Sequence, residues 1–176
     1  MMHRGKHGDW PASPEIEKLI NEVMSHIDVA ADLGCGVGRF CNILLSHANK
    51  VYCIDKDPQS IEVARNRING NAIFLAEDAE HTSIKSGEVD FLLMVNSFHD
   101  MENKDGVAKE IHRVLSDGGL ALIIEFKPGL IGFGPPPWLR MKPEEIREIF
   151  FRNGMINVWT REIDSQNALL FRKQLR

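Results

Sequence analysis

The sequence predicts a doubly wound α/β protein with a mostly parallel sheet of seven strands. Short apolar runs alternate with segments whose apolar residues recur at helical spacing, which is typical of parallel strands covered by helices on both faces. A glycine-rich turn follows the first apolar run. The last two apolar stretches flank the turn residues 164–167, which indicates an antiparallel hairpin near the C-terminus.

Capping residues and glycines divide the first half of the chain into three helices and three strands. Ser13 and Pro14 form a cap-and-proline start for the first helix, and Asp57 and Pro58 repeat it for the third. The break at 69–71 ends that third helix. Helices are therefore expected at 14–27, 37–48 and 58–68, and strands at 29–33, 50–55 and 72–76.

The second half of the chain continues the alternation and adds one long interruption. Strands are expected at 89–95, 120–126, 156–163 and from 168 to 171 or beyond, and helices at 102–115 and 143–151. The Gly- and Pro-rich segment 127–142 breaks the alternation, and long loops in compact domains are often functional. We expect a single domain in which 127–142 forms a lid-like insertion on the substrate side and residues 1–12 form a flexible arm.

Composition narrows the class of protein. The 176 residues suit one domain, and a net charge of −4 offers no electrostatic footprint for nucleic acid. The three cysteines form no C-x-x-C pair, which disfavours a disulfide framework or a zinc site and fits a reducing cytoplasm. No apolar run reaches the roughly 18 residues of a membrane span. We expect a cytoplasmic protein without a metal, either a monomer or a homodimer.

The glycine turn, Gly34-Cys-Gly36-Val-Gly38, indicates a ligand that rests on backbone amides at a helix start. The dinucleotide pattern G-x-G-x-x-G fits poorly, because the third glycine comes one position early and Arg39 stands in its place. Asp32, directly before the turn, would repel a pyrophosphate and attract an ammonium or a sulfonium. S-adenosylmethionine carries both cations and no phosphate.

Five segments in order resemble the motifs of class I S-adenosylmethionine-dependent methyltransferases, which have a Rossmann-like fold. Residues 32–38 resemble the first motif, D-x-G-x-G-x-G, and the resemblance covers nearly the whole chain. Asp117 departs from the pattern, since it stands where the family's turn before the fifth strand has proline. The segment 125–138, which starts Glu-Phe-Lys and later contains Gly-Pro-Pro, resembles the small prokaryotic methyltransferase type 11 group. The four other matching segments are 53–58, 77–81, 89–99 and 115–119.

The resemblance implies a set of residues that bind S-adenosylmethionine. Asp55 is implied as the ribose ligand, and it follows Asp32 at close to the offset of roughly 20 residues that such an acid shows. Its alternative role as a helix cap is already filled by Asp57. For the adenine end, Asp78 is favoured while Glu77 competes for the assignment. The implied set is Asp32, Gly34, Cys35, Gly36, Gly38, Asp55, Lys56, Asp78, Ala79 and Asn96.

The acceptor side is less well defined by the sequence. His99 follows the fourth strand and has a pKa suited to a general base, although a helix-start or solvent-facing histidine is equally consistent. Asp100 is expected to cap the helix from 102, and Glu125 lies near the end of the fifth strand. Three aromatic residues are expected on the substrate side: Phe98, Phe133 and Trp138.

These observations predict a methyltransferase that moves a methyl group from S-adenosylmethionine to a small molecule by in-line displacement. An NAD-dependent oxidoreductase is one alternative, but Asp32, Gly38 and Arg39 disfavour it. A catalytically inactive module of the same fold is another alternative. Methylation of RNA or protein has no support from a basic stripe.

Overall fold

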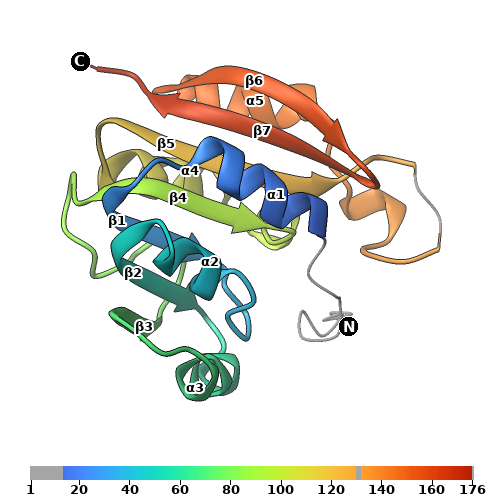
Figure 1. Ribbon diagram of the computed structural model, residues 1–176. Helices are drawn as coiled ribbons and strands as arrows, with labels where there is room; N and C mark the ends of the chain where they lie inside the picture. The colour runs from blue at the N-terminus through green and yellow to red at the C-terminus, as the bar shows by residue number, and fades with distance from the viewer. Residues whose placement is uncertain (1–13, 130–131, 176) are drawn as a thin grey trace.

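Seven strands form one sheet in the computed structural model, which describes residues 14–129 and 132–175 (Figure 1). The strands are β1 (Ile27–Leu33), β2 (Ala48–Asp55), β3 (Ala72–Ala76), β4 (Val89–Val95), β5 (Leu115–Phe126), β6 (Met155–Ile163) and β7 (Gln166–Lys173). Their order is β3-β2-β1-β4-β5-β7-β6, and β7 runs antiparallel to both of its neighbours. The predicted mostly parallel sheet with a C-terminal hairpin is confirmed.

Helices cover both faces of the sheet, as the near-continuous apolar strands require. Residues of α1, α2 and α3 pack on one face, and residues of α4 and α5 pack on the other (Figure 1). Successive residues of β1 point to opposite layers, with Ala30 in one and Ala31 in the other. The helices are α1 (Pro14–Val23), α2 (Cys41–Leu45), α3 (Pro58–Arg67), α4 (Lys104–Val114) and α5 (Pro143–Arg152), with short 3-10 turns η1 (Phe98–Asp100) and η2 (Pro137–Leu139).

Strand order reverses between β1 and β4. The chain runs outward from β1 through β2 to β3, then returns to place β4 on the other side of β1. Ligands of such sheets bind beyond the carboxyl ends of the strands at this point. The glycine turn follows β1 and the segment 96–99 follows β4, so both lie where a ligand site is expected.

Several predicted boundaries are wrong. The helix expected at 37–48 is only α2, because Gly38 keeps the chain in a turn and β2 begins early, with Ala48 paired to Ile27. Strand β5 begins at Leu115, well before 120. Helix α4 is capped by Asn103, whose Oδ1 accepts from the amide of Gly106 at 2.9 Å, so Asp100 is not its cap. No helix among the described residues is long and apolar enough to cross a membrane.

Phe98 lies in the hydrophobic core, which corrects the expectation that it faces the substrate. Its ring is 0% exposed and tilts against Phe150 at a centroid distance of 5.2 Å. Phe150 in turn stacks on Phe171 at 4.4 Å. The turn η1 directs Phe98 into the layer between the sheet and α4 and α5. The residue therefore contributes packing energy beneath the site and no exposed surface to it.

Truncating Phe98 should cost stability on the scale of a core aromatic. We expect Phe98→Ala to lower the free energy of unfolding by roughly 3–5 kcal/mol, because a large buried ring leaves a cavity. Phe151→Ala is the matched control, since that ring is 71% exposed and its loss should cost no more than about 0.5 kcal/mol. Urea unfolding of both variants measures the difference, and equal losses would show that Phe98 is not a core residue.

Candidate active site

The glycine turn adopts a backbone that side chains rarely tolerate. Gly34, Gly36 and Gly38 have φ angles of 75°, 54° and 83°, in the left-handed region that favours glycine. A Cβ on Gly34 would lie 2.5 Å from Ser97 Oγ, and one on Gly38 would lie 2.5 Å from the Cδ1 atom of Ile68. Contacts within the protein, and not only a ligand, therefore require the first and third glycines.

Asp55 ties this turn to the end of β2. Its Oδ2 accepts from the amide of Gly36 at 2.8 Å, and its Oδ1 accepts from the amide of Asp57 at 2.9 Å. The cap of α3 is Asp57, whose side chain accepts from the amide of Gln59, so Asp55 does not serve as the cap. A carboxylate has about four acceptor sites, which leaves Asp55 able to accept further hydrogen bonds.

The side chain of Cys35 is buried, so this residue takes part in the turn through its backbone. Its thiol is buried and contacts the carbonyl oxygen of Gly36 at 3.5 Å. The amides of Gly34 and Cys35 both donate to the carbonyl oxygen of Ile54, at 2.8 and 2.9 Å. The turn is thus held against β2 at three successive residues.

Asp32 is a buried acid at the end of β1. Its side chain is 2% exposed, and Oδ2 accepts from the thiol of Cys41 at 3.7 Å. Burial raises the pKa of Asp32 to about 7, the Cys41 thiol opposes this, and the negative charge of Asp55 adds to it. No ion pair with Asp32 occurs within the described ranges. A cation arriving beside this carboxylate would stabilise its ionised form.

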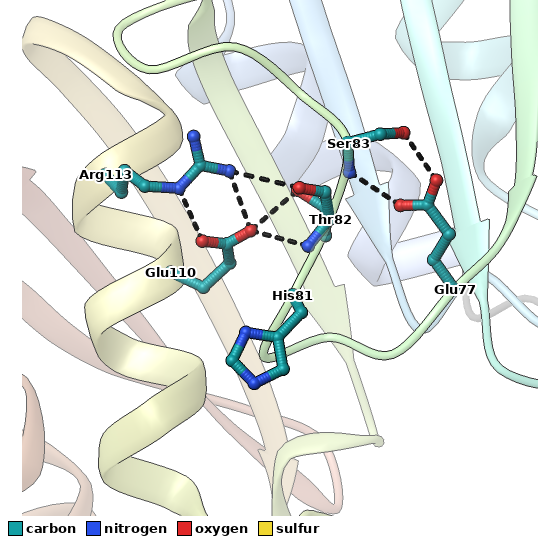
Figure 2. Close-up of a pocket in the computed structure, with 6 residues that line it drawn as sticks. All are labelled: Glu77, His81, Thr82, Ser83, Glu110 and Arg113. Carbon is teal, nitrogen blue, oxygen red and sulfur yellow. Dashed lines mark hydrogen bonds and ion pairs between the residues drawn. The ribbon is translucent and has the colours of Figure 1, made fainter.

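The segment after β3 presents Asp78 and Ala79. Asp78 is exposed, and its Oδ1 accepts from the amide of Glu80 at 2.9 Å, while Ala79 is buried. The competing acid, Glu77, is engaged: its carboxylate accepts from the amide of Ser83 at 2.6 Å and bonds the hydroxyl of the same residue (Figure 2). Asp78 is therefore the better placed of the two acids to meet a ligand.

Two further predicted cofactor residues, Lys56 and Asn96, directly follow β2 and β4. Lys56 is exposed directly after Asp55. Asn96 follows β4 with a left-handed φ of 55°, and its Oδ1 accepts from the side-chain amide of Gln166 at 2.6 Å. Gln166 is buried on β7, seventy positions away along the chain. Sequence reasoning missed Gln166, because nothing local indicates which residue β7 brings beside Asn96.

His99 is held between two carboxylates. Its Nδ1 lies 2.8 Å from Glu125 Oε2, its amide donates to Glu125 Oε1 at 2.9 Å, and its Nε2 lies 3.3 Å from Asp100 Oδ2. The side chains of His99 and Glu125 are 3% and 2% exposed. Burial acts to lower the pKa of His99, but the hydrogen bond and charge of Glu125, with Asp100, outweigh it, so the pKa lies above its usual value.

Arg140 anchors the described part of the 127–142 segment. Its guanidinium donates to the carbonyl oxygens of Phe133, Pro135 and Lys127 at 2.7, 2.9 and 3.2 Å. Phe133 and Trp138 are 65% and 81% exposed, so they enclose no pocket in this arrangement. Residues 130 and 131 lie outside the described residues, as do residues 1–12. Sequence reasoning missed Arg140, which carries no motif of its own.

A model of the methyltransferase domain family matches residues 31–123, more than half of the chain. The chain belongs to the methyltransferase domain family. The matched range begins at the strand before the glycine turn and ends within β5, so it contains Asp32, Asp55, Asp78 and His99.

Solved structures and a curated relative agree with this assignment. The chain is similar to a SAM-dependent methyltransferase from Aquifex aeolicus, with a TM-score of 0.82 and 22% identity over 90% of this chain and 89% of the other. A type 11 methyltransferase from Sulfolobus solfataricus gives a TM-score of 0.79 and 28% identity, over 93% and 94%. Ribosomal RNA-processing protein 8 from Arabidopsis thaliana is 33% identical over 132 residues, which are 72% of this chain and 40% of that protein.

The family and the fold give S-adenosylmethionine as the cofactor. The residues present fit this molecule on independent grounds. Buried Asp32 suits a cationic group, since its pKa of about 7 reflects an unfavourable buried charge. Asp55 retains acceptor capacity for hydroxyl groups, and the loop from Gly34 to Gly38 offers backbone without side chains. No pyrophosphate is needed to explain any of these features.

Proposed function

We propose that the protein transfers the methyl group of S-adenosylmethionine to a small-molecule acceptor. The observation that carries the proposal is the pair of carboxylates, Asp32 and Asp55, on either side of a glycine turn at the strand-order reversal. This pair suits a ligand with an ammonium at one end and ribose hydroxyls at the other. The chain spans 40% of the Arabidopsis relative and 49% of methyltransferase GfsG from Streptomyces halstedii, so their activities are not carried over whole.

Each cofactor-side residue has a proposed role. Asp32 faces the ammonium, and the loop from Gly34 to Gly38 offers backbone without side chains to the methionine part. Asp55 accepts from the ribose hydroxyls, with exposed Lys56 beside it. Asp78 accepts from the adenine amino group. Ala79 and Asn96 line the same end of the sheet, where they limit how the adenine and the sulfonium can lie.

Residues His99, Glu125 and Asp100 could carry the proton that an acceptor loses when it is methylated. When bound, the cofactor supplies a methyl group on a positively charged sulfur, which a nucleophile displaces in line. We propose that His99 takes the nucleophile's proton, with Glu125 holding the ring and stabilising its charged form. Asp100 is 43% exposed, and its contact with Nε2 links the buried ring to the surface. Lys104, at the start of α4, opposes the charge of the two acids.

The methyl acceptor could belong to either of two classes, a small molecule or RNA, and the charge of the protein and its relatives favour different ones. The net charge of −4 supports a small molecule, because RNA binding draws on basic patches. RNA is the second candidate, favoured only by the similarity to ribosomal RNA-processing protein 8. Radiolabelled S-adenosylmethionine, incubated with the protein and either a small-molecule extract or total RNA, separates the two. Label in the small-molecule fraction is expected, and label confined to RNA would replace the first proposal.

Calorimetric titration tests the cofactor assignment. We expect S-adenosylmethionine and S-adenosylhomocysteine to bind the wild type and NAD not to bind. Asp55→Ala should weaken both by about tenfold or more, because it removes charged acceptors and frees the amide of Gly36. Asp117→Ala, an exposed acid far from the turn, is the control and should bind normally. Binding of NAD alone, or of no ligand, would refute the assignment.

The pKa of Asp32 predicts how binding depends on pH. A cationic ligand favours the ionised carboxylate, and the pKa of Asp32 in the free protein is raised to about 7, so binding weakens as pH falls below 7. S-adenosylhomocysteine should bind about tenfold more weakly at pH 6 than at pH 8. Methylthioadenosine, which lacks the ammonium, should show no such change, and Asp32→Asn should abolish the dependence. A flat profile for the wild type would contradict this role.

A pH–rate profile tests the role of His99. Its neutral form is the base, and Glu125 raises its pKa, so the rate should rise with pH through that raised value. Glu125→Gln removes the charge that raises the pKa, and the midpoint should therefore move to lower pH. A lower rate with an unmoved midpoint would make His99 and Glu125 a structural pair only.

A further inference from the structure

A polar network holds the loop between β3 and β4 against α4 (Figure 2). Residues 77–88 link the two strands without helix or strand structure. Glu110 of α4 accepts at Oε2 from both the amide and the hydroxyl of Thr82, at 2.7 and 2.8 Å. Glu110 thus fixes the middle of this loop to α4 through two bonds to one residue.

Arg113, one turn further along α4, makes most of the remaining contacts. Its Nη2 donates to the carbonyl oxygens of Thr82 and Ile84 at 3.3 and 2.8 Å, and its Nη1 donates to Ser86 Oγ at 3.1 Å. Nε and Nη2 also bond the two oxygens of Glu110, at 2.6 and 2.8 Å. One guanidinium thus fixes three loop residues, which its planar fork of donors allows and a lysine would not.

The acid of this pair is buried and charged. Glu110 is 7% exposed. Burial acts to raise the pKa of Glu110, but the hydrogen bonds from Arg113 and Thr82 outweigh it and hold the pKa below its usual value. Removing Arg113 would leave the buried charge of Glu110 without its cation, so the stability of this carboxylate depends on Arg113.

A cavity of about 430 Å³ lies beside this network, lined by Glu77, His81, Thr82, Ser83, Glu110 and Arg113 (Figure 2). Its acids are bound by its own donors: Glu77 pairs with Ser83, and Glu110 pairs with Thr82 and Arg113. The lining is therefore arranged to hold the loop, and it does not present a set of groups aimed at a ligand.

The proposed adenine contacts precede the residues that α4 holds. Asp78 and Ala79 lie in a turn in which the amide of His81 donates to the carbonyl oxygen of Asp78 at 3.1 Å. Glu77, bonded to Ser83, closes this turn from one side, and Thr82, bonded to α4, anchors the other. We propose that Glu110 and Arg113 are positioning residues that preorganise Asp78 and Ala79 for the adenine of the cofactor, an inference that rests on the proposed function.

The test measures dissociation constants of S-adenosylhomocysteine and methylthioadenosine for Arg113→Gln. Both ligands carry the adenine, so both should bind about tenfold more weakly and by the same factor. The pH dependence of S-adenosylhomocysteine binding, which reports the distant Asp32 end, should be unchanged. General loss of structure would not preserve that dependence. Thr82→Val, which removes one hydroxyl bond to Glu110, should give a smaller loss in the same direction.

Arg152→Gln is the matched control. Arg152 of α5 also makes an ion pair with α4, through two bonds of 2.7 Å to the carboxylate of Asp105. Within the described part of the chain, these bonds do not reach the 77–88 loop. It should leave both dissociation constants within about twofold of the wild type. Unchanged binding by Arg113→Gln, or by Thr82→Val if the first variant does not fold, would overturn the positioning role and leave the proposed function standing. A wild type that binds neither ligand would overturn both.

Discussion

The carboxylate of Asp55 joins the glycine turn to the end of β2, and the geometry of the site depends on this contact. The amide of Gly36 reaches Asp55 only because the turn adopts positive φ angles, which place successive amides toward β2. The same carboxylate orders the start of α3 through the amide of Asp57. A single acid thus positions the turn, the strand end and the next helix relative to one another, and it keeps acceptor sites for a ligand.

Charge gives this geometry its chemical preference. The negative charge of Asp55 disfavours the ionised form of Asp32, which is almost completely buried. Such a pair is poorly suited to a phosphate and well suited to a molecule that brings a cation and hydroxyl groups. The preference follows from the sheet, since β1 and β2 are parallel neighbours that end at the same edge.

Local patterns predicted the order of the strands along the chain and the hairpin, because each depends on residues close together in the chain. The cofactor acids come from local motifs of the same kind, and their role stays a prediction. Predictions failed where distant residues decide the outcome. The helix expected at 37–48 shortened because β2 pairs with β1 from Ala48. Phe98 turned inward because α5 brings Phe150 beside it. The bonds of Arg113 to the loop and of Gln166 to Asn96 span 27 to 70 positions, and no local pattern indicates them.

A structure of the complex with S-adenosylhomocysteine tests the central claim most directly. The account predicts the ribose hydroxyls within hydrogen-bond distance of Asp55, with the Gly36 amide still bound to the same carboxylate, and the ammonium beside Asp32. A ligand bound away from the glycine turn would contradict the account. So would a ligand bound at the turn with Asp55 directed away from the ribose.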